Sequence, residues 1–339
     1  MKKKVSLKDI AKKVGVSTAT VSYVLSKGKN SRVSEEVSEK VKKAAKELNY
    51  QPNQIAKSLK MGKTFTIGLV VADISNPFFA NIARIIEDEA KKLNYTVIFG
   101  SSDEQADKSW DLIQFLMNRQ VDGFIIAPTE GSEKQIKHLK DNNIPFVLID
   151  RHFPKIDSNY VVIDNFEAAF SAIDRLIETG NKKIGMIAYS SALHHMTQRI
   201  KGYREALTNK GLERKNSWLH EIEYSGIEEG VKEAINAMLD ENDRVDALFF
   251  ATNTLAVHGL RYLNELKHIV GRDIAIVSFD EGEAFDFYYC PLTYVKQPLL
   301  ELGSNAVRIL TNHISRDAEN EQVSLEAKLI VRESCKIAY

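Results

Sequence analysis

The strongest constraint on what this chain can fold into is an alternation that begins at Phe65. Short apolar runs, such as "FTIGLVV" (65–71) and "VDGFIIA" (121–127), are separated by longer amphipathic stretches. Apolar runs of this kind are typical of strands buried on both faces, and their regular exchange with helices indicates parallel α/β sheets. The pattern restarts at residue 160 with "YVVI". It therefore predicts two successive doubly wound subdomains.

Hydrophobic periodicity places the expected elements of this region. We expect strands at 65–71, 96–100, 121–127, 144–150, 160–163, 183–188, 246–251, 273–280 and near 327–332. We expect helices at 77–93, 132–142, 165–179, 197–210, 227–241 and 254–267, and around 107–119 and 298–314.

The first sixty residues follow a different pattern, that of three short helices. Ser6 with Asp9 forms a capping box that opens a helix, and Gly15 can end that helix in the left-handed conformation. Ser17 can cap a second helix, and a third begins near Ser34. Two short helices that meet at a Gly-Val-Ser turn, with a third to close the core, predict a helix–turn–helix unit.

Charge is distributed unevenly along the chain. Residues 1–62 hold 15 Lys and Arg against 5 Asp and Glu, whereas the whole chain of 339 residues holds 46 of each. A basic module on an acidic body indicates a polyanionic partner, although a solvated basic face would give the same count. The second helix carries Ser and Thr hydroxyls on its outer face and can enter a DNA major groove, which is about 12 Å wide. We therefore expect the front of the chain to bind DNA.

The remaining bulk features mostly exclude functions. Cys290 and Cys335 are too few for a disulfide framework, and the start "MKKKVSLKDIAKK" lacks the apolar region of a signal peptide. No apolar run reaches the roughly 18 residues that a membrane span needs. We expect a cytoplasmic protein with no membrane segment, no cofactor and no metal. We interpret His194 and His195 as an ordinary surface pair.

Two separated motifs carry a specific resemblance. The segments "VSLKDIAKKVGVSTATVSYVL" and "ELNYQPNQIAKSLK" (47–60) are similar to the N-terminal signature of the LacI/GalR family of transcription factors, and the similarity continues along nearly the whole chain. The resemblance implies a three-helix helix–turn–helix domain and a periplasmic-binding-protein-like body of two doubly wound parallel-sheet subdomains. The implied boundaries are 1–50 for the DNA-binding domain, 51–62 for a hinge helix, and 63–339 for the effector-binding and dimerisation domain. Within that body we expect an N-subdomain at about 63–163 and 294–326 and a C-subdomain at about 164–293 and 327–339.

The resemblance also implies the DNA contacts. Thr18, Ala19 and Tyr23 occupy base-reading positions, and Ser17, Thr20 and Ser22 match phosphate-contacting positions. Tyr23 departs from the family pattern, because most relatives have Arg there and Tyr cannot form a bidentate contact with guanine. The expected set of DNA-binding residues is Ser17, Thr18, Ala19, Thr20, Ser22, Tyr23, Tyr50, Asn53, Ala56, Leu59 and Lys60.

The stretch "QPNQIAKSLKMG" (51–62) is too short to be a stable helix alone, since isolated helices below about 12–15 residues are marginal in water. An ordinary interdomain linker could have the same sequence pattern. The resemblance implies a hinge helix that pairs with its dimer mate in the minor groove. There Leu59 would wedge between base pairs, with Ala56 and Lys60 beside it.

Polar residues at the ends of the body strands predict a ligand site, because ligands of open α/β sheets bind at the carboxyl ends of strands. Carboxylates accept from sugar hydroxyls, guanidinium groups donate to sugar oxygens, and an aromatic ring stacks on the apolar sugar face. Any one of these residues alone is more often structural. In the positions that the family implies, we expect effector binding by Asp73, Phe79, Asp150, Arg151, Arg199, Tyr224, Asn253 and Asp280.

An enzyme and a free-standing sugar-binding protein are the two alternative classes of function. An enzyme is disfavoured because the chain lacks G-x-G-x-x-G after a strand, the P-loop motif, H-E-x-x-H and G-x-S-x-G. A free-standing sugar-binding protein would not need the basic helical module. We therefore predict a sequence-specific transcriptional regulator, expected to be a repressor, that binds pseudo-palindromic operator DNA as a homodimer, with a tetramer made of dimers as the alternative. We expect its effector to be a sugar, with a purine or a nucleoside as the alternative. The sequence does not indicate whether the effector weakens or strengthens binding to the operator.

Overall fold

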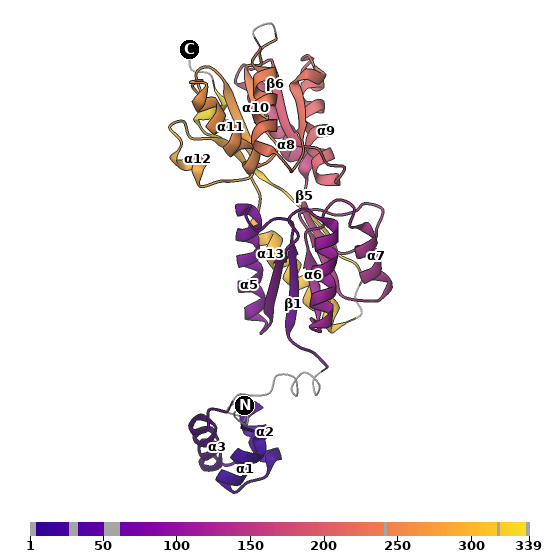
Figure 1. The fold of residues 1–339 in the computed structure, drawn as a ribbon, viewed down its shortest axis with the longest axis vertical. Helices are drawn as coiled ribbons and strands as arrows, with labels where there is room; N and C mark the ends of the chain where they lie inside the picture. The colour runs from indigo at the N-terminus through magenta and orange to yellow at the C-terminus, as the bar shows by residue number, and fades with distance from the viewer. Residues whose placement is uncertain (1–4, 27–32, 51–61, 241–242, 317–318, 337–339) are drawn as a thin grey trace. The chain divides into compact units, whose positions relative to one another are not determined.

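The computed structural model describes residues 5–26, 33–50, 62–240, 243–316 and 319–336. The chain divides into two units, residues 1–64 and residues 65–339. Figure 1 shows the helical first unit and the α/β second unit. The hinge segment predicted at 51–62 lies, apart from Gly62, outside the described residues.

The described residues of the first unit form three helices: α1 (Leu7–Val14), α2 (Thr18–Ser26) and α3 (Glu35–Glu47). The predicted capping box is present, and the Ser6 N–H donates to Asp9 Oδ2 at 2.8 Å. Gly15 follows α1 with φ of 77°, the left-handed conformation that lets the chain turn at once into α2. All three helices pack against one another around a small core of Ile10, Ala11, Val21, Val24, Val41, Ala44 and Ala45.

The second unit contains two six-stranded sheets. The first sheet has the order β11-β5-β4-β3-β1-β2, and all of its strand pairs are parallel. Leu69 of β1 lies opposite Phe99 of β2 and Ile125 of β3, which sets the register at the centre. The strands of this sheet are β1 (Thr66–Val71), β2 (Thr96–Ser101), β3 (Gly123–Ile126), β4 (Phe146–Ile149), β5 (Tyr160–Ile163) and β11 (Gln322–Leu325).

Four helices accompany the first sheet. Two of them, α5 (Pro77–Lys92) and α13 (Leu299–Ser315), pack against each other although they are far apart in the sequence (Figure 1). The other two, α6 (Ala106–Asn118) and α7 (Glu133–Asp141), contribute to a separate apolar cluster with the opposite side chains of β1, β3 and β4. Both faces of the sheet are therefore covered, as continuous apolar strands require.

The second sheet has the order β12-β10-β9-β8-β6-β7, and only β12 runs antiparallel to its neighbour. Helices α8 and α9 pack together, as do α10 and α11. The strands are β6 (Ile184–Tyr189), β7 (Leu219–Ile222), β8 (Ala247–Phe250), β9 (Ala275–Phe279), β10 (Thr293–Lys296) and β12 (Lys328–Ile330). The helices are α8 (Asn165–Glu178), α9 (His194–Asn209), α10 (Ile227–Met238), α11 (Asn253–Glu265) and the short α12 (Ala284–Phe287).

The chain crosses between the two sheets three times. It leaves the first sheet after β5, returns between β10 and α13, and leaves again between β11 and β12. The sheet that contains 65–163 is therefore completed by a strand from the end of the chain. The second crossing was expected near residue 294, which falls inside β10; β10 continues to Lys296 in the second sheet.

The predicted fold class, a helix–turn–helix unit with two parallel-sheet α/β subdomains, is confirmed. Among the described residues, the strands β7, β10 and β11 and the helix α12 were not predicted, nor were two short 3-10 helices at Asn216–Trp218 and Glu333–Cys335. Helix α9 begins at His194, three residues before the expected start at 197. Neither cysteine is bonded, and both are buried. Among the described helices none is long and apolar enough to span a bilayer.

Candidate functional sites

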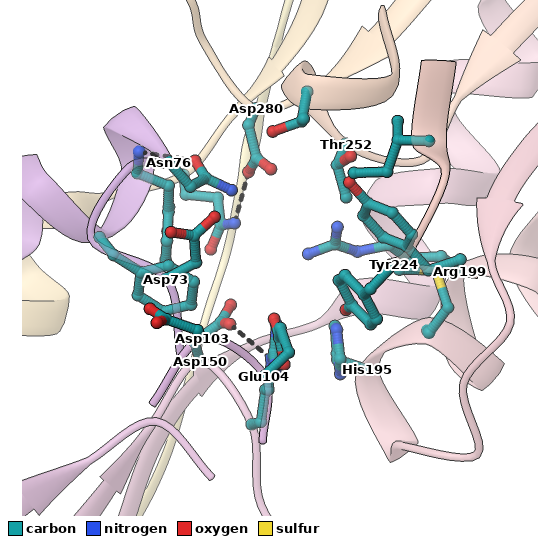
Figure 2. Close-up of a pocket in the computed structure, with 18 residues that line it drawn as sticks. Asp73, Asn76, Asp103, Glu104, Asp150, His195, Arg199, Tyr224, Thr252 and Asp280 are labelled. Atoms are coloured by element: carbon teal, nitrogen blue, oxygen red, sulfur yellow. Dashed lines mark hydrogen bonds and ion pairs between the residues drawn. The ribbon is translucent and has the colours of Figure 1, made fainter. Parts of the chain in front are cut away.

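A cavity of about 200 Å³ lies between the two sheets of the second unit, where strand ends from both meet. Figure 2 shows Asp73 and Asn76 on one side of it and Arg199 and Tyr224 on the other. The lining residues in the described part of the chain are Asp73, Asn76, Phe78, Phe79, Asp103, Glu104, Asp150, Arg151, Tyr189, His195, Met196, Arg199, Tyr224, Ile227, Thr252, Thr254, Asp280 and Gln297.

Seven of the eight residues predicted to bind an effector line this one cavity: Asp73, Phe79, Asp150, Arg151, Arg199, Tyr224 and Asp280. Asn253 does not. It is the first residue of α11 and is 3% exposed. Its side-chain amide donates to the Glu281 carbonyl at 3.2 Å, while its Oδ1 accepts from the Thr254 hydroxyl. In this structure Asn253 joins two loops, and its neighbours Thr252 and Thr254 reach the cavity instead.

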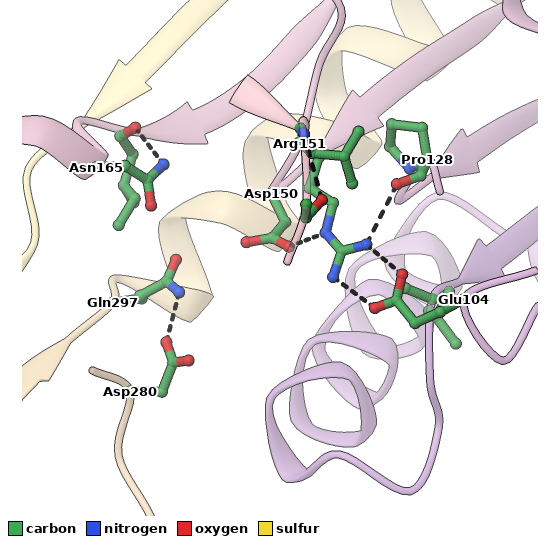
Figure 3. A network of polar contacts seen from close by, with 12 residues as sticks. Glu104, Pro128, Asp150, Arg151, Asn165, Asp280 and Gln297 are labelled. Carbon is green, nitrogen blue, oxygen red and sulfur yellow. Dashed lines mark hydrogen bonds and ion pairs between the residues drawn. The ribbon is translucent and has the colours of Figure 1, made fainter. Parts of the chain in front are cut away.

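Arg151 is held on three sides by the first subdomain. Both of its terminal nitrogens donate to Glu104 at 2.7 Å, and Nη1 also donates to the Pro128 carbonyl (Figure 3). Its Nε lies 3.3 Å from a carboxylate oxygen of Asp150. Bidentate pairing fixes the plane of the guanidinium group, so this arrangement holds the Asp150 carboxyl at the cavity wall. Burial raises the pKa of Asp150, and nearby Arg151 opposes that rise.

Arg199 is the second buried cation, and it is held differently. Its Nε donates to Asn165 Oδ1 at 2.8 Å, and Nη1 donates to the Ala251 carbonyl at 2.7 Å. The guanidinium carbon lies 3.5 Å from the centre of the Phe279 ring. Within the described residues no carboxylate is paired with Arg199, and Nη2 has no hydrogen-bond partner. Arg199 therefore keeps an unused donor for a ligand (Figure 2).

Asp280 follows β9 and is 6% exposed. Its Oδ1 accepts from Gln297 Nε2 at 2.6 Å, and Gln297 directly follows β10, where the chain crosses back to the first subdomain (Figure 3). Burial raises the pKa of Asp280 to about 6, and this rise is opposed by Arg199 and by the hydrogen bond from Gln297. The carboxyl therefore lacks the solvation it would have in water, and a donor from a ligand would supply it.

Tyr189 and Tyr224 form the aromatic part of the wall. Their rings stack at a centroid distance of 4.1 Å and an angle of 17°. Burial raises the pKa of Tyr189 to about 12 and also raises the pKa of Tyr224, so both phenols stay neutral donors. Phe79 contributes a further ring that the Arg151 guanidinium faces.

Sequence reasoning missed several residues of the lining. Asp103 and Glu104 come two and three residues after the end of β2, and Tyr189 ends β6, so the strand-end rule that found Asp73 applies to them as well. Gln297 was not predicted as a site residue because the strand that precedes it, β10, was not predicted. The surface assignment of His195 is wrong: it is 4% exposed and lines the cavity, because α9 starts three residues earlier than the periodicity indicated.

The first unit presents a polar surface on α2. Ser17, Thr18 and Ala19 are exposed, and Thr20, Ser22 and Tyr23 are half-buried. Ser17 caps α2, because its Oγ accepts from the Thr20 N–H at 3.0 Å. Tyr50 packs against the core of this unit. The other predicted DNA contacts, Asn53, Ala56, Leu59 and Lys60, lie outside the described residues.

Known proteins resemble this chain over its whole length. Residues 6–53 match the family "Bacterial regulatory proteins, lacI family", and residues 64–333 match "Periplasmic binding proteins and sugar binding domain of LacI family". Catabolite control protein A of Priestia megaterium is 32% identical over 98% of this chain and 99% of its own. A solved complex of the transcriptional regulator CelR with cellobiose is 28% identical, covers 98% of this chain and 100% of that one, and has a TM-score of 0.71. The lac repressor dimer on operator DNA, at 24% identity over 98% of this chain and 100% of that chain, shares the fold with a TM-score of 0.86.

A helix–turn–helix unit followed by a two-sheet body with a polar cavity defines a DNA-binding regulator that responds to a small molecule. The chain belongs to the lacI family of bacterial regulatory proteins. It is therefore a transcriptional regulator and not an enzyme. The match over residues 6–53 also excludes the alternative of a free-standing sugar-binding protein. Regulators of this family are cytoplasmic proteins.

Proposed function

We propose that the protein is a homodimeric repressor of transcription whose affinity for a pseudo-palindromic operator changes when a sugar occupies the cavity. The observation that carries this proposal is the cavity itself. It is lined from both subdomains, and one of its carboxyls, Asp280, is hydrogen-bonded to Gln297 on a segment that crosses between them. A ligand that binds both walls favours one relative orientation of the subdomains, and its effect equals its differential affinity for the two orientations.

We assign DNA reading to α2, with Thr18, Ala19 and Tyr23 on base edges and Ser17, Thr20 and Ser22 on phosphates. The exposure of Ser17, Thr18 and Ala19 supports this assignment. The N-terminus of α2 adds a partial positive charge that favours phosphate. The same proposal gives residues 51–62 to a hinge helix in the minor groove, where Asn53, Ala56, Leu59 and Lys60 would make contacts, and gives Tyr50 a place beside the duplex.

We assign 1–50 to the DNA-binding domain and 63–339 to the effector domain. Within the effector domain the N-subdomain takes about 63–163 and 297–326, and the C-subdomain takes the remainder. The second boundary is moved from 294 to 297 because β10 belongs to the second sheet. These assignments place the effector between the two subdomains and the hinge at the start of the N-subdomain.

Recognition of a sugar fits the chemistry of the wall. Buried carboxyls at Asp150 and Asp280 accept from hydroxyl groups, Arg199 donates from its unused nitrogen, and Phe79 and Tyr224 offer apolar surface. The similar regulator CelR was solved with cellobiose, which supports a sugar as the class of effector. Asn253 acts indirectly in this proposal, through the loop that carries Thr252 and Thr254.

A second copy of the chain is the proposed partner in solution. The edge strand β2 exposes Ile98 by 37% and Phe99 by 59%, whereas the inner strands β3 and β4 are buried along their whole length. Apolar side chains on an exposed sheet edge are a liability that a partner surface removes. Two-fold pairing would also give the two copies of α2 the symmetry of a palindromic operator.

DNA binding is tested with an operator selected by the protein from random duplexes, followed by fluorescence anisotropy. We expect specific, salt-sensitive binding that one or more sugars change. Ser17→Asp keeps a capping side chain but sets a carboxylate against phosphate, so operator affinity should fall at least about tenfold with little change in melting temperature.

Ser17→Asn is the matched control, because it also caps α2 and carries no charge. It should bind the operator much more tightly than Ser17→Asp. Equal binding by both variants would contradict the phosphate assignment. Failure to select any duplex would contradict the function, and an affinity that no sugar changes would contradict the proposed class of effector.

A further inference from the structure

His195 is a buried polar residue of the cavity to which the family assignment gives no role. It is the second residue of α9 and is 4% exposed. Its Nδ1 is shielded from solvent and has no hydrogen-bond partner among the described residues. Its Nε2 also lacks a partner there, but it is not shielded from solvent in the same way. Since the ring lines the cavity (Figure 2) and Nδ1 is shielded, Nε2 is the nitrogen available to a ligand.

The unpartnered Nδ1 indicates which nitrogen carries the proton. A neutral imidazole has one N–H donor and one acceptor nitrogen. A buried donor without a partner is rarer in proteins than a buried acceptor without one. The favoured tautomer therefore leaves the bare lone pair on shielded Nδ1 and puts the proton on Nε2. In this tautomer His195 presents an N–H group to the cavity.

The surroundings keep this ring neutral. Burial lowers the pKa of His195 well below its ordinary value, and Arg151, Arg199, His194 and His152 lower it further. His195 is thus a neutral donor that lines the same cavity as the unused donor of Arg199. Two donors on one wall suit an electron-rich oxygen of the ligand, since a sugar oxygen can accept from both.

The charges around the cavity restrict that ligand further. The described lining has five carboxyl groups, at Asp73, Asp103, Glu104, Asp150 and Asp280, but only two guanidinium groups, at Arg151 and Arg199. Arg151 is already bound by Glu104, and Asp103 is paired with Lys108 outside the cavity. A phosphate group would have to approach an excess of carboxylates with only Arg199 uncommitted. Repulsion between a phosphate and the carboxylates of the same buried cavity is strongly unfavourable.

We propose that His195 is a specificity-determining residue, which donates from Nε2–H to a ring or hydroxyl oxygen of an uncharged, unphosphorylated sugar. This inference rests on the proposed function of the cavity as the effector site. It adds that the effector is uncharged, and that His195 recognises one of its oxygen atoms by a hydrogen bond.

The class of ligand is tested by thermal shift on the complete protein. The probes are D-glucose, D-galactose, D-ribose, D-xylose and cellobiose, together with glucose 6-phosphate, ribose 5-phosphate, hypoxanthine and guanine. At least one uncharged sugar should raise the melting temperature, because binding to the folded state alone adds stability. Neither phosphate should do so. A phosphorylated sugar or a purine as the strongest ligand would overturn the inference and leave the DNA-binding function intact.

The role of His195 is tested by titration calorimetry with the sugar that binds. His195→Phe keeps a ring but removes the donor, and we expect at least about tenfold weaker binding. His195→Gln restores an N–H donor and should recover part of that loss. The matched control is His194→Phe, because His194 is adjacent in sequence but does not line the cavity; its affinity should stay within about twofold of the original.

A deoxy-sugar series separates a direct contact from a change in packing. The analogue that lacks the recognised oxygen should bind the unmodified protein weakly, yet lose nothing further when His195 is replaced by Phe. Unchanged affinity of His195→Phe, or equal losses with every analogue, would overturn the assignment.

A measurement without ligand keeps the two proposals distinguishable. Nitrogen-15 NMR of the histidine side chains at pH 7.5, with His195 assigned from the His195→Phe spectrum, should show the proton on Nε2. A proton on Nδ1 would overturn the inference about His195 whatever the effector is. Failure of every sugar to bind, with the proton found on Nε2, would instead contradict the proposed sugar function.

Discussion

Asp150 and Asp280 are two buried carboxyl groups of the cavity that are poorly solvated. Both are 6% exposed, and burial raises the pKa of each. Within the part of the chain that the structure describes, the Asp280 carboxyl accepts one hydrogen bond, from Gln297, whereas an ionised carboxylate can accept several. Removing a charge from water without full compensation is unfavourable, so a ligand hydroxyl gains more here than at an exposed carboxylate.

The raised pKa of Asp280 has a definite sign in a stability measurement. Between the ordinary value of 3.8 and the folded value of about 6, the folded protein holds a proton that the unfolded chain has lost. The contribution of Asp280 to the free energy of unfolding is therefore fully present below pH 4. It falls by about 3 kcal/mol as the pH rises through 6. Asp280→Asn removes that fall, and should make the ligand-free body more stable than the unmodified protein above pH 7.

The measurement is thermal unfolding of both proteins at pH 4.5, 6 and 7.5 without ligand. The amide can still accept from Gln297, so packing is kept, while the response to the effector should be lost. A stability difference that is the same at all three pH values would contradict the buried charge as its cause.

At the scale of single elements, the pair α8 and α9 supports the cavity. Gly202 of α9 lies so close to α8 that a Cβ there would be 2.4 Å from the Phe166 carbonyl oxygen and 3.0 Å from the Phe170 nitrogen. The neighbouring turn of α9 carries Arg199, whose Nε bonds to Asn165 at the start of α8. The close approach of two backbones therefore positions the guanidinium group.

Gly202→Ala should separate these helices, because a backbone carbonyl cannot move aside as a flexible side chain can. We expect a loss of roughly 1–3 kcal/mol of stability and weaker ligand binding. Gly211→Ala is the control in the loop after α9, where the left-handed φ of 66° costs about 1 kcal/mol but a Cβ meets nothing within 4 Å. Chemical denaturation and calorimetry measure both variants. Ligand affinity that drops equally in the two would contradict a role for the α8–α9 contact.

Some helices and strands could be predicted from the sequence, and others could not. The long, strongly periodic helices and the continuous apolar strands of both subdomains were predictable, because their patterns are local. The strands β7, β10 and β11 were not, since each interrupts its short apolar stretch with polar residues (LHEI, TYVK and QVSL) and is held by pairing with strands distant in the sequence. The same limit affected the site. Strand-end carboxyls such as Asp150 could be found from the pattern, whereas His195 depended on a helix boundary.

At the scale of the whole molecule, the two units have separate cores. A chain that begins at Phe65 should therefore fold, bind the effector within about twofold of the full-length affinity, and fail to bind the operator. Calorimetry and anisotropy check these two expectations. Analytical ultracentrifugation checks a third, that the shortened chain remains a dimer; a monomer would contradict the proposed partner surface on β2.

The three crossings between the sheets have a consequence for synthesis on the ribosome. The DNA-binding unit is complete once the first 64 residues have emerged. The first sheet must wait for α13 and β11, and the second must wait for β12, all of which come from the final stretch of the chain after residue 298. During translation the nascent protein therefore completes the unit that binds DNA long before it completes the unit that binds the effector.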